Sequence, residues 1–265
     1  MKSNLKYKNL FFTLMIFLFM FLFFSFISLV IINLFREGLP NFFANVYDEE
    51  ILFAIRLSLV TSTISTLICM AFALPISYAL ARYEFPFKSL VMSIMQIPMS
   101  LPPLASGLAL LLFFSLDNIR NFLDKYDISP VFSVKGIIVA HFFINTPYMI
   151  RILKATIENI DPKLEFVSRT LGYSKLKTFF KITLPLSKKG LFASTVITWS
   201  KAMGEFGTVL LLAGATRMKT ETLPVTIYLN VSVGSLDKAL TSAIVLIVIS
   251  SISLLIFSRF EDSKF

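Results

Sequence analysis

The chain has 265 residues, of which 56% are hydrophobic and 15% charged, with 29 phenylalanines and a formal net charge of +9. Soluble domains carry about 25% charged residues, and here the apolar residues fall in long blocks. These features exclude an ordinary soluble protein and predict an all-α polytopic membrane protein. The basic excess does not indicate nucleic-acid binding, because there is no polar fold to carry a stripe of positive charge.

Six apolar blocks are long enough to cross a hydrocarbon core of about 30 Å. The first block is longer than a signal peptide and lacks a small-residue cleavage site, so we expect a retained helix within an N-terminal segment, 1–36. The other five form one membrane domain, 51–257. The blocks cover residues 10–35, 51–81, 90–114, 135–153, 190–212 and 239–257.

The lysines and arginines between the blocks favour cytoplasmic N- and C-termini. In that orientation sixteen of them are cytoplasmic, seven are extracytoplasmic and two lie inside predicted spans. Nine of the sixteen lie between Arg151 and Lys189. The opposite orientation would place this basic connection outside the cell.

Few residues are suited to metal or redox chemistry. One cysteine, Cys69, and one histidine, His141, are too few for a disulfide framework or a transition-metal site, so we expect no metal and no cofactor on this chain. His141 has no carboxylate in its own block, which favours a hydrogen-bonded interior residue. The sequence contains no G-x-x-x-x-G-K-[ST] loop, so any ATP must bind to a partner.

The cytoplasmic connection at residues 155–190 contains a short helix with its own start and stop signals. Asp161 before Pro162 is typical of a helix N-terminus, and Gly172 favours a left-handed stop. One face of this helix is apolar and carries Leu164, Val167 and Leu171. No soluble domain of the chain covers this face, so it predicts a partner protein. A basic loop lying on anionic lipid is the alternative.

This connection resembles the EAA loop of permease subunits of bacterial ATP-binding-cassette (ABC) importers. The resemblance rests on Gly172, followed at fixed spacing by Ile182 and by Leu184-Pro185. In that family the loop forms a coupling helix that docks on a separate ATPase subunit. The resemblance implies this docking role for Leu164, Glu165, Val167, Leu171, Gly172, Ile182, Leu184 and Pro185. The chain departs from the family at Phe166-Val167-Ser168, where Glu-Ala-Ala is typical.

The third block is interrupted by Pro98, Pro102, Pro103 and Gly107. Proline removes amide donors, and unsatisfied carbonyls at membrane depth are tolerated beside a protein interior or a watery cavity. A kinked helix that lines a translocation path is one interpretation, and a kink that serves only packing is the other. The P-x3-PP-x3-G run looks like that of molybdate-type permeases, which favours the path.

The fifth block contains Lys201 and Glu205, four residues apart, where opposite charges on one helix face can pair. Charges at membrane depth usually face the bundle interior and mark a transport path, although a self-neutralising pair that fixes helix depth is the alternative. Gly204 and Gly207 are further candidates for this path, and as small residues they also permit close helix approach. The run from Lys201 to Gly207 resembles the Arg-Ala-x-Gly-Glu-Phe-Gly run of molybdate and sulfate permeases.

The segment 213–228 is predicted to be extracytoplasmic, and its Thr-x-Thr-Leu-Pro-x-x-Ile-Tyr ending resembles molybdate-type permeases. Arg217 and Lys219 are candidates to attract an anion or a docked binding protein. An ordinary solvated loop is the alternative.

The resemblance covers residues 51–257 and implies the type I ABC importer permease fold in a bacterial or archaeal cytoplasmic membrane. It also implies a homodimer, two ABC ATPase subunits and an extracytoplasmic oxyanion-binding protein. The implied substrate is molybdate, with tungstate or sulfate as alternatives, and the chain is then a transport subunit rather than an enzyme. Two other functions are less well supported by the sequence. A membrane-embedded transferase would need a cluster of His, Asp or Glu, and an ion-coupled transporter would need more buried carboxylates and an inverted repeat, neither of which is evident.

Overall fold

The computed structural model describes residues 2–262, and this range is helical with no strand. Four helices are long and apolar enough to cross a membrane, which confirms the prediction of an all-α polytopic protein. They are α1 (Lys2–Gly38), α3 (Glu49–Arg82), α7 (Val134–Glu158) and α14 (Leu236–Asp262). Lys264, which the sequence places among the cytoplasmic basic residues, lies outside the described range.

The third predicted span is sharply bent rather than gently kinked. It consists of α4 (Lys88–Ser100) and α5 (Pro103–Phe114), and the chain direction bends by 112° between the two helices. Pro102 and Pro103 have no amide hydrogen to donate to the preceding turn, so the helical ladder stops and restarts at Pro103. The pair reaches the length of one span only when both helices are taken together.

The fifth predicted span, residues 190–212, is also broken, so the prediction of one continuous helix there is wrong. It divides into α11 (Lys188–Met203) and α12 (Gly207–Leu212), separated by residues 204–206. The 16 residues of α11 extend about 24 Å at 1.5 Å per residue, which is less than the hydrocarbon thickness.

The remaining helices are short and lie at the ends of the long ones or between them. They are α2 (Phe42–Asn45), α6 (Asp117–Asp124), α8 (Pro162–Thr170), α9 (Lys175–Thr178), the π-helix η1 (Phe179–Thr183), α10 (Leu184–Leu186) and α13 (Leu223–Ser232).

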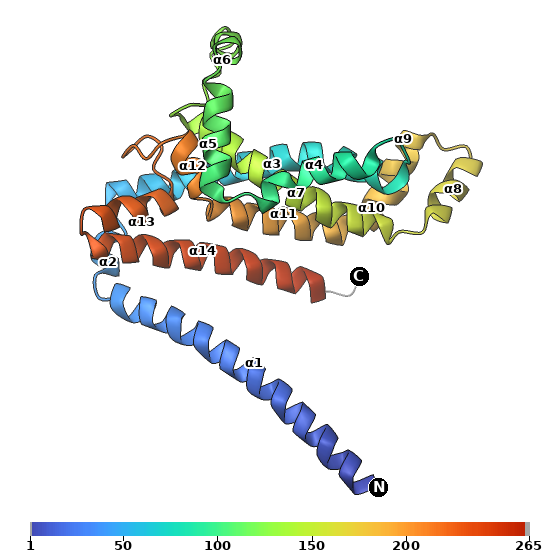
Figure 1. Ribbon diagram of the computed structural model, residues 1–265, viewed down its shortest axis with the longest axis horizontal. Coiled ribbons are helices and arrows are strands. Elements are labelled where there is room, and N and C mark those ends of the chain that lie inside the picture. The colour runs from blue at the N-terminus through green and yellow to red at the C-terminus, as the bar shows by residue number, and fades with distance from the viewer. Residues whose placement is uncertain (1, 263–265) are drawn as a thin grey trace.

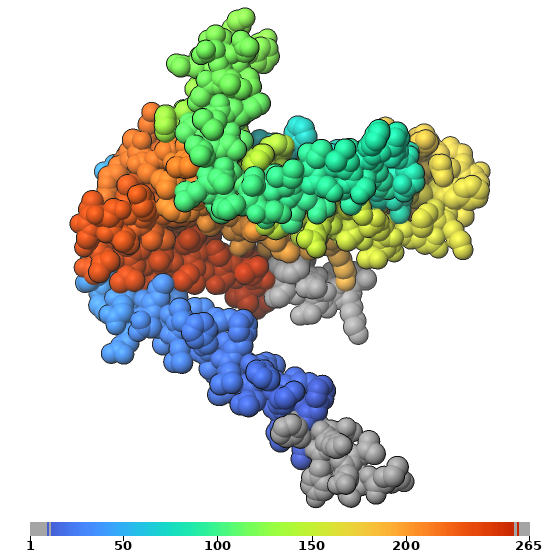
Figure 2. Space-filling view, viewed as in Figure 1, coloured from blue at the N-terminus to red at the C-terminus, as the bar shows by residue number. Residues whose placement is uncertain are grey.

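The bundle consists of α3, α4, α7, α11 and α14, which run along the long axis of the molecule (Figure 1). One end of it carries α8 and the other carries α2 and α13, and we name these the α8 end and the α13 end. Helices α3 and α7 run parallel, since Ser65 contacts His141 near the α13 end while Ser77 bonds to the Ile150 carbonyl nearer the α8 end. Helix α5 stands across the bundle axis, and α1 diverges from it with exposed apolar side chains (Figures 1 and 2).

The start of α1 and the end of α14 both point toward the α8 end of the bundle (Figure 1). In a Cys69→Ala background, we expect a cysteine at Lys177 to react with a membrane-impermeant reagent only in inverted vesicles. A cysteine at Lys219 should react in intact cells. Both positions are exposed. The reverse labelling pattern would contradict the predicted cytoplasmic location of the connection at residues 155–190.

Candidate functional site

Helix α8 has the boundaries that its start and stop signals predict. The Asp161 side chain accepts a hydrogen bond from the Lys163 amide at 2.9 Å, and Pro162 takes the first helical position. Gly172 adopts a φ of +90°, which lies in the left-handed region that glycine enters without steric cost. The chain therefore presents a short, separately capped helix at one end of the bundle.

The outward face of α8 is apolar and exposed. Leu164, Val167 and Leu171 are 48%, 52% and 76% exposed, and Phe166 beside them is 60% exposed. Pro185 is exposed too, whereas Ile182 and Leu184 are partly buried. A contiguous exposed apolar patch marks an interaction surface, so this face fits the partner contact that the sequence predicts.

Glu165 differs from the other residues expected to dock. It is 7% exposed, and its Oε1 accepts an ion-pair hydrogen bond from Arg82 Nε at 2.8 Å. The carboxylate therefore faces the chain's own bundle, and its predicted place in the docking contact is wrong. No local sequence pattern indicates this pair, because its members are 83 residues apart.

The two broken spans meet at their breaks, where α12 packs closely on α5 (Figure 1). A Cβ on Gly207 would lie 2.8 Å from Pro103 Cβ, and one on Gly107 would lie 2.9 Å from the Thr208 carbonyl oxygen. Thr208 Oγ1 donates a hydrogen bond to the Pro103 carbonyl at 3.1 Å. This bond satisfies a carbonyl near the proline break. Gly107 and Gly207, two of the predicted path residues, therefore allow α5 and α12 to pack closely together.

The other predicted path residues are not part of this close contact. Gly204 is exposed, and a Cβ there would meet only atoms of its own helix, at 3.9 Å. Pro98 lies inside α4, before the break. Within this chain, the close helix approach that both glycines permit is found at Gly207 and not at Gly204.

Lys201 and Glu205 do not form the self-neutralising pair that was the alternative to a transport path. Because α11 ends at Met203, the two residues no longer share a helix face. Lys201 Nζ lies over the ring of Tyr148, 3.9 Å from its centroid, in a cation–π contact. Glu205 Oε1 instead accepts a hydrogen bond from the Thr208 amide at 3.1 Å, in the first turn of α12.

Two further expectations concern His141 and Arg217. His141 is 2% exposed with Nδ1 3.3 Å from Ser65 Oγ, which fits the predicted interior residue. Arg217 forms an ion pair with Glu50 and lies 4.0 Å from the buried Glu221. Its charge is compensated, so Arg217 fastens its loop to α3 rather than standing free to attract an anion.

Residues 71–262 match the protein family described as "Binding-protein-dependent transport system inner membrane component". The chain belongs to this family. It is therefore a multi-pass permease of the inner membrane, a transport component without a catalytic site of its own.

Two relatives of the family illustrate how far the similarity extends. The chain is 31% identical over 239 residues to the "Molybdate/tungstate transport system permease protein WtpB" of Methanocaldococcus jannaschii, covering 90% of each chain. It is 34% identical over 196 residues to the "Sulfate transport system permease protein CysW" of Synechococcus elongatus, covering 74% of this chain and 68% of the relative.

The fold is that of solved ABC importer permeases. A chain of a bacterial alginate ABC transporter, solved with an alginate-bound periplasmic protein, matches with a TM-score of 0.75 at 18% identity. The match covers 96% of this chain and 93% of that one. At this identity the comparison concerns the fold alone, and it confirms the predicted type I permease fold.

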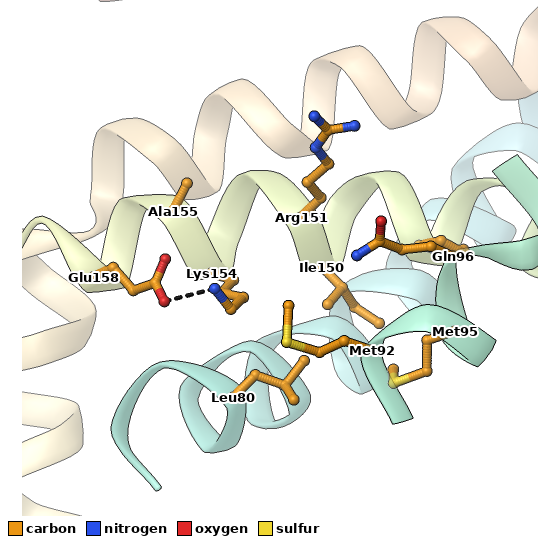
Figure 3. Close-up of a pocket in the computed structure, with 10 residues that line it drawn as sticks. Leu80, Met92, Met95, Gln96, Ile150, Arg151, Lys154, Ala155 and Glu158 are labelled. Carbon is orange, nitrogen blue, oxygen red and sulfur yellow. Dashed lines mark hydrogen bonds and ion pairs between the residues drawn. The ribbon is translucent and has the colours of Figure 1, made fainter. Parts of the chain in front are cut away.

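This permease also has a cavity of about 360 Å³ near the α8 end, between α3, α4 and α7 (Figure 3). Met92, Met95 and Gln96 of α4 face it from one side. Lys154 lines it from α7, but its Nζ is paired with Glu158 at 2.6 Å, so its charge is compensated. No residue of α4 is fully buried, although Met92 and Met95 pack against the cluster formed by α3 and α7 beside this cavity.

The left-handed cap of α8 leads to a prediction about partner binding. Gly172→Val should strain the cap by about 1 kcal/mol or more, because a β-branched residue disfavours positive φ. A Cβ there meets nothing within 4 Å, so the cost is confined to the backbone. We expect the valine variant to insert normally but to co-purify with less ATPase subunit. Gly172→Asn is the control, since asparagine tolerates this conformation, and equal ATPase recovery with both variants would contradict a role for the cap.

Proposed function

We propose that this chain is the permease subunit of an ABC importer for a tetrahedral oxyanion, with molybdate as the substrate and tungstate or sulfate as the alternatives. The observation that carries the transport role is the exposed apolar face of α8, with its glycine cap, at the end of a polytopic bundle. The oxyanion class is supported by relatives named for molybdate/tungstate and for sulfate.

The proposed assembly contains two copies of this chain, two ABC ATPase subunits and an extracytoplasmic oxyanion-binding protein. The two copies enclose a path along their shared axis, and both chain termini are cytoplasmic. ATP binds to the partner ATPases and draws the paired coupling helices together. The rigid helices convert this motion into opening on one side of the membrane and closing on the other.

Lys201 supports an anion path. Charged residues at membrane depth usually face a bundle interior or a watery cavity. Lys201 is exposed on a single copy of the chain, and its contact with the Tyr148 ring fixes its direction without cancelling its charge. Its positive potential therefore acts on whatever lies beside that surface, which in the proposed dimer is the path.

The test is uptake by vesicles that contain the permease, its ATPase and the co-purifying binding protein. Molybdate uptake should depend on ATP, and tungstate should compete with it at equal concentration. The anion retained by the binding protein should be identified independently by elemental analysis. Uptake of sulfate that molybdate does not inhibit would replace the proposed substrate, and failure to transport any oxyanion would overturn the proposal.

A further inference from the structure

The inward face of α8 is polar, unlike its exposed outward face. Glu165 and Ser168, one helical turn apart, are 7% and 5% exposed, with Glu165 against α3 and Ser168 against Thr178 of α9. A short helix that only needed anchoring would do so with apolar side chains. This one is held through hydrogen bonds and an ion pair, which impose direction as well as proximity.

Glu165 joins three separate parts of the chain. Its Oε1 accepts from Arg82 Nε at 2.8 Å and from Thr183 Oγ1 at 2.9 Å, and its Oε2 accepts from the Tyr78 hydroxyl at 3.1 Å. Arg82 Nη2 in turn donates to the Ile160 carbonyl at 2.8 Å. The carboxylate of α8 is thus tied to the last turns of α3 and to η1, while Arg82 holds the segment between α7 and α8.

The π-helix η1 allows the hydrogen bond from Thr183 to Glu165. Thr178 and Thr183 are five residues apart, and in an α-helix their directions would differ by about 140°. Hydrogen bonding from i to i+5 in a π-turn brings such positions toward one face. Thr183 accordingly reaches Glu165, while the Thr178 hydroxyl lies 3.0 Å from that of Ser168. The backbone departs from the α-helix where two threonines must face α8.

Burial makes the ion pair between Arg82 and Glu165 hard to break. The side chains of Arg82 and Glu165 are each 9% exposed, so little solvent is available to replace their mutual hydrogen bonds. Removing one member of such a pair leaves a buried charge without a partner. Helix α3, at the other side of the pair, packs along α7 and α11. A displacement of α8 would therefore reach the bundle through these bonds.

We propose that Arg82 and Glu165 form a joint that makes α8 and the adjoining end of α3 move as one body, so that motion of α8 on the ATPase reaches the transmembrane bundle. The proposal rests on the proposed permease function. In this role both are positioning residues, and they touch neither substrate nor ATP. Their effect is on how much transport accompanies each round of ATP hydrolysis.

The test removes both charges at once. The double variant Arg82→Gln/Glu165→Gln removes both charges together, so neither is left without its partner, and it also removes the bond from Arg82 to the Ile160 carbonyl. We expect it to insert and to bind the ATPase as the wild type does, and to hydrolyse ATP. The number of anions transported per ATP should fall at least about fivefold, the lower range of measured coupling between distant sites. The matched control is Lys154→Gln/Glu158→Gln, which removes an ion pair on α7 with side chains 20% and 45% exposed, and should keep the wild-type ratio.

The outcomes separate the joint from simpler roles. A wild-type transport ratio in the double variant would overturn the joint. Loss of ATPase binding would also overturn it, because the pair would then only shape the docking surface. If the wild-type chain itself neither binds an ATPase nor transports an oxyanion, the proposed function fails instead.

A second measurement leaves the pair intact. Spin labels at Thr170 on α8 and at Glu84, just beyond α3, are at exposed positions. In the wild-type complex their separation should stay the same when ATP binds, while distances from α8 to the second copy change. A separation between Thr170 and Glu84 that changes with ATP would show that α8 moves independently of α3, and would overturn the joint.

Discussion

Gly207→Val should sharply lower the yield and thermal stability of the membrane domain. A Cβ at this position would lie 2.8 Å from Pro103 Cβ and 3.2 Å from the Leu104 amide nitrogen. Neither neighbour is the flexible end of a side chain, so α12 has to move away from α5. Overpacking of this kind costs about 1–3 kcal/mol, and here it also threatens the bond from Thr208 to the Pro103 carbonyl. The stability of the detergent-solubilised chain, measured by size-exclusion chromatography after heating, reports the loss.

Gly204→Ala is the matched control within the same motif. The nearest atoms to a Cβ at Gly204 are 3.9 Å away, which is ordinary contact, and the residue is exposed. We expect its stability to remain within about 0.5 kcal/mol of the wild type, as for most surface substitutions. If Gly207→Val proved as stable as Gly204→Ala, close packing at the two breaks would be unnecessary to the fold.

Signals carried by neighbouring residues predicted local structure well. The apolar blocks marked the helices of the bundle, and Asp161, Pro162 and Gly172 marked both ends of α8 within about one residue. These features depend on sequence-local physics, namely hydrophobic length, helix capping and the cost of positive φ. The multi-pass fold follows from them before any tertiary contact is known.

Contacts between residues that are far apart in the sequence could not be predicted from local patterns. The spacing of Lys201 and Glu205 allowed a pair as the alternative to a transport path, but that alternative assumed an unbroken helix. The helix is broken at residues 204–206, and beyond the break Gly207 and Thr208 pack against Pro103 of α5. Glu165 was likewise assigned to the docking face, although helical spacing places it beside residues of either face. Arg82, which decides its direction, is 83 residues away, so no local pattern could reveal the pair.

Lys201→Gln should lower oxyanion uptake about tenfold or more while leaving expression and ATPase assembly unchanged. A unit charge 4 Å from an anion contributes about 4 kcal/mol at an effective dielectric constant near 20, and tenfold corresponds to about 1.4 kcal/mol. Because Lys201 lies on Tyr148 rather than on a carboxylate, its removal strands no charge. Lys125→Gln removes another exposed lysine, to which no transport role is assigned, and should leave transport at the wild-type rate. Lys201→Arg should retain most of the uptake, since it keeps the charge.

The double variant Lys201→Gln/Glu205→Gln separates an anion path from a simple charge pair. If the two residues neutralised one another, removing both charges would restore transport. The structure places Glu205 on the Thr208 amide instead, and glutamine still offers an oxygen there, so Glu205→Gln alone should have little effect. We therefore expect the double variant to transport as poorly as Lys201→Gln, in uptake assays with the reconstituted complex. Recovery of wild-type uptake would mean that Lys201 only neutralises the charge of Glu205, and Lys201 would then not be part of the translocation path.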